Sequence, residues 1–134
     1  MKKVVDSSGW LHFFMNGPLM EYYANFLTRN FKDLVTPTLV FFEVNRRIRQ
    51  VADDELALAC LSDLEKTHVA DLTSDIACRA AELSLKYKLA TADSLIYATA
   101  DIYGLKLVTS DSDFKNLPGV EYISSEESSS PYKP

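Results

Sequence analysis

The stretch TADSLIYATADIYGLKLVTSDSDF, residues 91–114, predicts a helix, a glycine stop and a strand. Apolar and small side chains recur along its first half at helical spacing: Leu95, Ile96, Ala98, Thr99, Ile102 and Tyr103. Thr91 is the expected N-cap of this helix, and Gly104 is placed to end it in a left-handed conformation. The apolar run over residues 105–108 then predicts a short, largely buried strand.

Acids stand at two informative places in this stretch. Asp93 lies in the first turn of the predicted helix, and Asp111 lies just past the carboxyl end of the predicted strand. Ligands of open α/β sheets bind outside the carboxyl ends of the strands, so this is where a site is expected. The alternative is that Asp93 only favours the helix dipole, while Asp111 and Asp113 are turn residues. Further acids at matching positions decide between the two interpretations.

Asp6 repeats the pattern near the start of the chain. Residues 3–5 predict a short strand, which Asp6 closes before Ser7, Ser8 and Gly9. A short apolar helix follows and breaks at residues 16–18, after which a second helix begins. The alternative role for Asp6 is to cap the first of these helices.

Glu43 lies on a helix predicted over residues 38–50, after a strand at residues 34–35. Apolar side chains line one face of that helix: Val40, Val44, Ile48 and Val51. A carboxylate beside such a stripe costs free energy unless it is paired or binds a cation. The alternative is an exposed ion pair between Glu43 and Arg47, one turn later, worth about 0.3–0.5 kcal/mol.

Arg46, Arg47 and Arg49 form the densest basic cluster of the chain. They indicate either a solvated helix face or contacts with phosphate groups beside an acidic site.

The rest of the chain continues the alternation of short strands and helices. A helix follows Asp53 and Asp54, a strand is expected at residues 68–72, and a helix begins at Thr73 or Ser74. A last strand is expected at residues 120–123. This pattern predicts one domain, residues 1–123, with a three-layer α/β/α sandwich around a mainly parallel sheet. Residues 124–134 lack apolar periodicity and are expected to be a polar, disordered tail.

Composition limits the classes of function. The chain has 134 residues and a net charge of −5, which permits an acidic cation pocket but no broad basic surface for nucleic acid. Cys60 and Cys78 lack histidines at zinc-ligand spacing, so both are expected to be buried free thiols in a reducing cytoplasm. No signal peptide and no membrane span are expected.

Four acids converge in the predicted fold. Asp6 and Asp111 follow strands that end at the same edge of a parallel sheet, while Glu43 and Asp93 lie on helices that enter or pass that edge. Two carboxylates at ~4 Å and an effective dielectric of ~20 repel by about 4 kcal/mol, which a divalent cation removes. Oxygen ligands suit Mg²⁺ or Mn²⁺, and such a site activates water against phosphodiesters.

Four segments carry a resemblance to a known family. VVDSS at 4–8, LVFFEV at 39–44, TADSLIYATA at 91–100 and LVTSDSDF at 107–114 resemble the PIN-domain ribonucleases, nearest to the VapC-type toxins of toxin–antitoxin pairs. The resemblance implies a PIN-like fold and Mg²⁺- or Mn²⁺-dependent cleavage of RNA by water. It also implies homodimers and inhibition by a small VapB-type antitoxin.

The resemblance assigns roles residue by residue. The metal-binding, catalytic carboxylates map onto Asp6, Glu43, Asp93 and Asp111. Thr109 and Ser110 match the polar residues that accompany the last acid, and Asp113 is an additional acid.

Two other classes of function remain as alternatives. One is a non-catalytic PIN-like interaction module, which the intact set of acids disfavours. The other is a phosphoacceptor domain with an acidic pocket. That class wants a lysine at the end of a late strand, facing the acids, whereas Lys106 lies inside its predicted strand.

Overall fold

The computed structural model of the chain describes residues 2–29 and 31–124. The predicted tail therefore lies, apart from Ser124, outside the described residues. A five-stranded sheet forms the centre of the fold, with the order β3-β2-β1-β4-β5 and parallel pairing throughout. Its strands are β1 (Lys3–Val5), β2 (Leu34–Pro37), β3 (His68–Ala70), β4 (Lys106–Thr109) and β5 (Val120–Tyr122).

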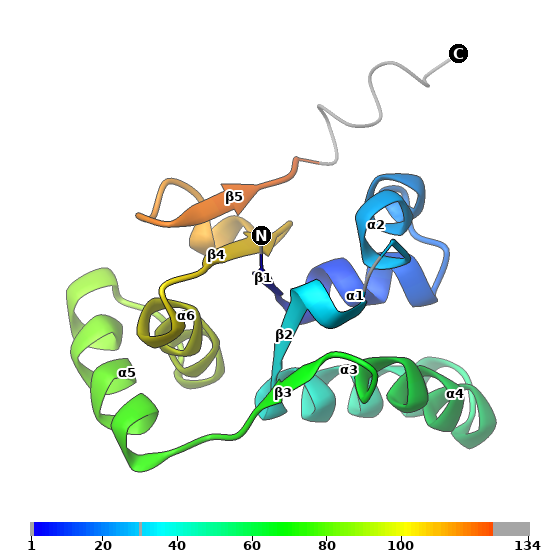
Figure 1. Cartoon of the computed structure of the whole chain (residues 1–134), viewed down its shortest axis with the longest axis horizontal. Coiled ribbons are helices and arrows are strands. Elements are labelled where there is room, and N and C mark those ends of the chain that lie inside the picture. The colour runs from blue at the N-terminus through cyan, green and yellow to red at the C-terminus, as the bar shows by residue number, and fades with distance from the viewer. Residues whose placement is uncertain (1, 30, 125–134) are drawn as a thin grey trace.

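Helices cover both faces of the sheet, as the sequence predicts. On one side lie α1 (Ser7–Phe14), α2 (Met20–Leu27), α3 (Thr38–Val51) and α4 (Asp54–Leu64), and on the other lie α5 (Ser74–Tyr87) and α6 (Thr91–Tyr103) (Figure 1). Two short 3₁₀ turns, η1 (Phe31–Asp33) and η2 (Ser112–Phe114), complete the described elements. The arrangement is the three-layer α/β/α fold.

The central strands are buried because helices cover both of their faces. Val4, Val5, Leu107 and Val108 are at most 1% exposed, which explains why β1 and β4 read as continuous apolar runs instead of alternating ones. On α3, Val40, Val44 and Ile48 face this core, as their spacing predicts. Each acid that follows one of these strands is therefore attached to the end of a buried strand.

Three details differ from the sequence-based expectations. Ala90, not Thr91, is the N-cap of α6, so Thr91 is already helical and caps nothing with its side chain. Val51, Ile102 and Tyr103 are exposed, and each lies in the last turn of its helix. Cys78 is exposed on α5, so only Cys60 is a buried thiol.

Among the described residues, no helix combines the length and the apolar character that crossing a membrane requires.

Candidate metal centre

The topology of the sheet brings the four predicted acids to one edge. Asp6 follows β1 directly, and Asp111 follows β4 by two residues. These two strands are neighbours and parallel, so their carboxyl ends coincide. The helix α3 starts where β2 ends and carries Glu43, while α6 runs back toward the amino end of β4, which leaves Asp93 at the same edge.

Three acids lie closest together. Asp93, Asp111 and Asp113 each offer a carboxylate oxygen, and these oxygens lie within 4.8 Å of one another. Asp113 is held near Asp111 by the short 3₁₀ turn, in which its backbone N–H donates to Asp111 Oδ1 at 2.9 Å. Asp113, expected only to accompany the other acids, therefore belongs to the closest group.

Asp6 lies at the buried base of this cluster and is 2% exposed. Ser8 Oγ donates to its Oδ1 at 2.6 Å, and Thr109 Oγ1 donates to its Oδ2 at 2.7 Å. Asp6 also accepts from the Gly9 N–H and caps α1, so the cap predicted as an alternative exists together with the placement in the cluster. Burial raises the pKa of Asp6 to about 7 against these hydrogen bonds, and the charge of Asp111 adds to the rise.

Asp93 is a second carboxyl that resists ionisation. Burial is the main cause that raises its pKa to about 6, and the negative charges of Asp111, Glu43 and Asp113 contribute further, in that order. All of the causes act in the same direction. The electrostatics therefore join Asp93 to three other acids of the edge, and Asp111 joins Asp6 to the same group.

Glu43 points toward the start of α1. Its Oε1 accepts a hydrogen bond from Ser7 Oγ at 2.8 Å, across 36 residues of sequence. Arg47 donates instead to Gln50, at 3.2 Å. The alternative role of Glu43, an exposed ion pair with Arg47, is thus not formed. Glu43 is oriented toward the acids instead.

The three candidate arginines differ in their surroundings. Arg49 donates to Asn45 and forms an ion pair with Asp54 at 2.7 Å, which directs it toward α4. Arg46 and Arg47 are exposed and lie one helical turn beyond Glu43 on α3. These two are placed better than Arg49 for contacts beside the acids.

Sequence reasoning assigned no site role to Ser7, Ser8 or Tyr23. The two serines orient Glu43 and Asp6, and Tyr23 OH lies 2.6 Å from Ser110 Oγ. The serines had a visible signal, because they follow Asp6 directly in the segment VVDSS. Tyr23 had none, because an aromatic side chain at helical spacing on α2 is typical of a core position.

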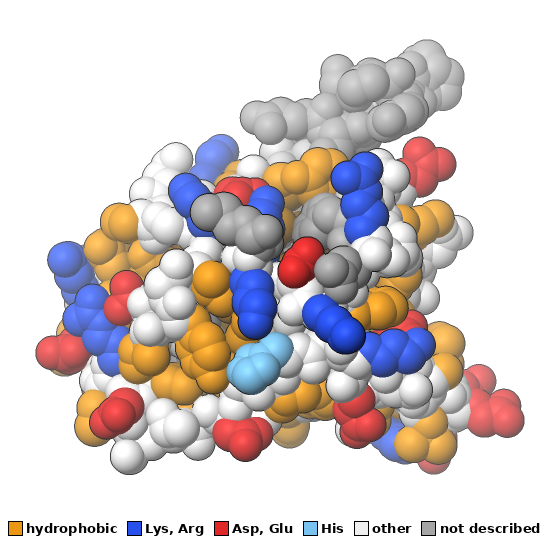
Figure 2. Space-filling model, in the orientation of Figure 1, with side chains coloured by type: hydrophobic (Ala, Val, Ile, Leu, Met, Phe, Trp, Pro, Cys, Tyr) orange, Lys and Arg blue, Asp and Glu red, His pale blue; other side chains and the backbone are white. Residues whose placement is uncertain are grey.

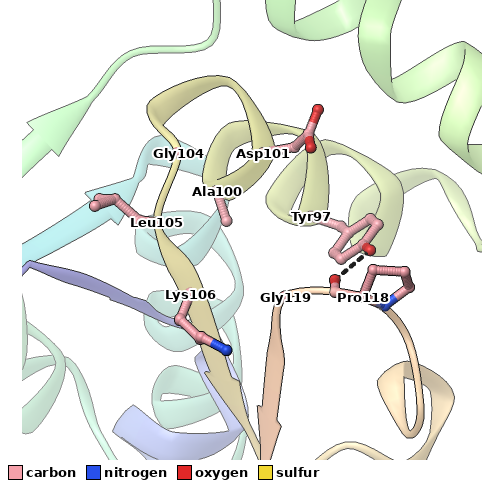
Figure 3. A pocket seen from close by; sticks show the side chains of 8 residues that line it. All are labelled: Tyr97, Ala100, Asp101, Gly104, Leu105, Lys106, Pro118 and Gly119. Atoms are coloured by element: carbon pink, nitrogen blue, oxygen red, sulfur yellow. Dashed lines mark hydrogen bonds between the residues drawn. The ribbon is translucent and has the colours of Figure 1, made fainter.

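A hollow of about 250 Å³ lies elsewhere on the molecule, between α6 and the segments that precede β4 and β5. Its lining includes Asp101, Lys106 and Gly119, and Tyr97 OH closes one side by donating to Pro118 O at 2.6 Å (Figure 3). Lys106 and Gly119 mark the amino ends of the strands, so this hollow is at the edge opposite the acids. The residues that line it do not include any of the acids at the carboxyl edge: Asp6, Glu43, Asp93, Asp111 and Asp113.

The chemistry of the cluster fits a hard divalent cation. Its donors are carboxylate oxygens, which suit Mg²⁺ or Mn²⁺. Among residues 2–29 and 31–124, the ion pairs of Lys3, Arg49, Lys66 and Arg79 go to acids outside the cluster. Uncompensated repulsion between fixed carboxylates is what a bound cation would relieve.

The family model of the PIN domain matches residues 3–120. The chain belongs to the PIN domain family. This confirms the resemblance drawn from the four sequence segments at the level of the PIN domain. No curated protein matches the sequence.

Solved structures share the fold of this PIN domain. A toxin–antitoxin complex from Klebsiella pneumoniae is similar with a TM-score of 0.75 at 21% identity, covering 91% of this chain and 100% of that one. VapC20 from Mycobacterium tuberculosis, titled a sarcin–ricin loop cleaving toxin, reaches 0.72 at 17% identity, covering 90% and 98%. DNA-bound VapBC from Salmonella typhimurium reaches 0.70 at 17% identity, covering 93% and 99%. At these identities the likeness establishes the PIN-like α/β/α fold.

Proposed function

We propose that this PIN domain is a metal-dependent endoribonuclease that cleaves RNA phosphodiester bonds with a metal-activated water. The observation that carries the proposal is the group of Asp93, Asp111 and Asp113, whose oxygens lie within 4.8 Å at the carboxyl edge of a parallel sheet. The raised pKa values of Asp6 and Asp93 support it, because burial and the charges of neighbouring acids make both carboxylates costly to ionise without a cation.

The residues divide into those that hold the cation and those that orient them. Asp93, Asp111 and Asp113 would hold Mg²⁺ or Mn²⁺ together with Asp6 or Glu43 from the base of the cluster. A bound divalent ion supplies an activated water and stabilises the charge on the leaving oxygen. Ser7, Ser8 and Thr109 fix the rotamers of Glu43 and Asp6, so these two carboxylates do not have to be ordered when the ion arrives.

Substrate contact needs cations that the acids do not supply. Arg46 and Arg47 lie one turn from Glu43 on α3, and on this proposal they contact the phosphates of the RNA backbone. The overall charge of −5 does not prevent local basic surface. Figure 2 shows Lys and Arg side chains grouped around a histidine near the middle of one face, with Asp and Glu side chains among them and toward the rim. The RNA contact proposed here rests instead on Arg46 and Arg47 of α3.

We further propose that the protein is the toxin of a toxin–antitoxin pair. Two of the similar structures are toxin–antitoxin or VapBC complexes, and a third is titled a toxin that cleaves the sarcin–ricin loop. On this proposal the protein is a cytoplasmic homodimer held inactive by a small VapB-type antitoxin. A small DNA-binding protein encoded next to it, which co-purifies with it and blocks cleavage, would support the pairing.

The two alternative functions differ in what they require of the site. A phosphoacceptor domain needs a lysine that faces the acids, but Lys106 opens β4 at the opposite edge and lines the hollow there. A non-catalytic PIN-like module needs no cation, so it leaves the repulsion among the acids without a purpose.

Cleavage of RNA by the purified chain tests the proposal. Structured RNA should be cut in Mg²⁺ or Mn²⁺ and left intact in EDTA, and Asp111→Asn should abolish cutting while the protein keeps its fold. Asp71→Asn, on an exposed link before α5, is the matched control and should cut like wild type. RNA that remains intact with either ion would favour the non-catalytic module.

A further inference from the structure

Tyr23 connects α2 to the loop that carries two of the clustered acids. Its hydroxyl lies 2.6 Å from Ser110 Oγ, across 87 residues of sequence. We propose that Tyr23 is a positioning residue: by holding Ser110 it sets the spacing of Asp111 and Asp113, and with it the affinity of the site for a divalent cation. The inference rests on the proposed metal site and adds to it a residue from outside the acidic edge.

The ring of Tyr23 has a defined place, which makes its hydroxyl a fixed anchor. The side chain is 0% exposed. It packs on His12 with the ring centroids 6.0 Å apart and the planes at 8°. Gly9 of α1 leaves the necessary room, because a Cβ there would lie 2.5 Å from Cε1 of Tyr23. This side chain is therefore already ordered in the folded protein, so binding of a cation costs no further entropy for ordering it.

Ser110 is held at a second point by Ser8. The backbone N–H of Ser110 donates to Ser8 Oγ at 3.0 Å, and the same oxygen donates to Asp6 at 2.6 Å. Ser110 thus has its main chain tied to α1 and its side chain tied to α2. This double attachment makes the residue before Asp111 one of the most restrained points of the loop.

Restraint of Ser110 passes to the acids through short covalent and hydrogen-bonded steps. Asp111 is the next residue, and its Oδ1 accepts from the N–H of Asp113. Displacing Ser110 therefore displaces two of the three carboxylates whose oxygens lie within 4.8 Å. Partners behind metal ligands typically change metal affinity by 10–100-fold when they are removed.

A purely structural tyrosine would behave differently. Loss of its hydroxyl would lower the free energy of unfolding of the whole domain but leave the geometry of the acids, once folded, unchanged. The two roles are separated by the local order of residues 109–114 in the metal-free protein and by the dissociation constant for Mn²⁺.

Tyr23→Phe removes the hydroxyl and keeps the ring. In the full chain without metal, amide hydrogen exchange of residues 109–114 should become faster than in wild type, while exchange in α5 and α6 stays the same. Calorimetric titration should show Mn²⁺ binding weakened about tenfold. Tyr103→Phe, at the last residue of α6 and 41% exposed, is the matched control and should match wild type in both measurements.

Ser110→Ala removes the same hydrogen bond from its other end. It should weaken Mn²⁺ binding to a similar degree. The double variant should bind Mn²⁺ no more weakly than either single variant, because both changes break the same hydrogen bond. If Tyr23→Phe does not fold, Ser110→Ala carries the same test.

The possible results separate this inference from the proposed function. Wild-type exchange and wild-type Mn²⁺ affinity in Tyr23→Phe would overturn the positioning role even if the enzyme cleaves RNA. Faster exchange and weaker Mn²⁺ binding would uphold it even if the wild-type protein cleaves no RNA. A wild-type protein that binds no Mn²⁺ would overturn both the metal site and the role of Tyr23 in it.

Discussion

The hydroxyl of Thr109 donates a hydrogen bond to Asp6, with 2.7 Å between Thr109 Oγ1 and Asp6 Oδ2. The bond joins the ends of β4 and β1, and both residues are buried. The same Oγ1 accepts the backbone N–H of Asp111 at 3.0 Å. One hydroxyl therefore stabilises the ionised form of Asp6 and holds the start of the acid loop.

Thr109→Val keeps the shape of this side chain and removes the hydrogen bond. The free energy of unfolding should fall by about 1–3 kcal/mol at pH 8, where Asp6 is ionised in the folded protein. The loss should be smaller at pH 5, where Asp6 is protonated and needs the donor less. Urea unfolding of the metal-free protein at both pH values measures the difference.

Thr36→Val is the matched control for that experiment. Thr36 is also buried and also hydrogen-bonded, to Thr67 at 2.6 Å, but away from the acids. Its loss of stability should be the same at pH 5 and pH 8. A pH-independent loss in Thr109→Val as well would show that Asp6 does not change its protonation state between pH 5 and pH 8.

Metal-free stability should depend on pH in a direction opposite to ordinary acid unfolding. The pKa of Asp6 is raised from 3.8 to about 7 and that of Asp93 from 3.8 to about 6. The folded state then holds more protons than the unfolded state between about pH 4 and pH 7, so the free energy of unfolding should increase as the pH falls from 8 to 5. Asp93→Asn should flatten the part of this curve below about pH 6.5, and Asp71→Asn should not.

Divalent cations should replace protons as the stabilising partner. At pH 8, Mg²⁺ at a hundredfold excess over Kd should add about 2.7 kcal/mol to the free energy of unfolding. Thermal melts in EDTA and in Mg²⁺ measure this gain. An equal gain in a variant that lacks Asp111 would place the bound ion elsewhere.

Asp113→Asn tests whether the third acid of the closest group is a ligand. Its oxygen lies within 4.8 Å of those of Asp93 and Asp111, so replacing the carboxylate should weaken Mn²⁺ binding at least ~10-fold in calorimetric titration. Asp101→Asn, on α6 and ion-paired with Arg79 away from the acids, is the control. Unchanged affinity in Asp113→Asn would return this residue to the role of a turn former.

The sequence predicted the edge at which the acids meet, because the rule about strand ends needs only the order of the elements. Asp6 and Asp111 follow apolar runs that are too short to be anything other than buried strands. The position of Tyr23 was not predictable, because its hydroxyl reaches a residue that only the tertiary fold brings near. The proximity of Asp113 to Asp93 depends in the same way on a 3₁₀ turn that no periodicity announces.

Two expectations about helix α6 were wrong, and each has a local cause. Thr91 has a capping side chain, but it is already the first residue of α6, and the N-cap position is taken by Ala90, whose backbone is extended. Ile102 and Tyr103 continue the helical spacing of α6, yet both are exposed in its last turn. The spacing of apolar residues identifies which face of a helix is covered. It does not identify how far along the helix the packed elements extend.

Arg46 and Arg47 can be tested against Arg49 for RNA contact. Changing the first two to Gln should weaken RNA binding by the metal-free protein and lower the dependence of its affinity on salt. Arg49→Gln should have less effect, because its side chain already pairs with Asp54. Fluorescence anisotropy with an RNA oligonucleotide at several salt concentrations gives both values, and equal effects of all three arginines would indicate a diffuse contact along α3.

The central claim is that the acids at the carboxyl edge form a metal centre, and anomalous diffraction from Mn²⁺-soaked crystals tests it most directly. We expect a peak bound by the carboxylates of Asp93 and Asp111 and absent from crystals of Asp93→Asn. Crystals that show no peak among these acids at saturating Mn²⁺, or an equal peak in the variant, would contradict it.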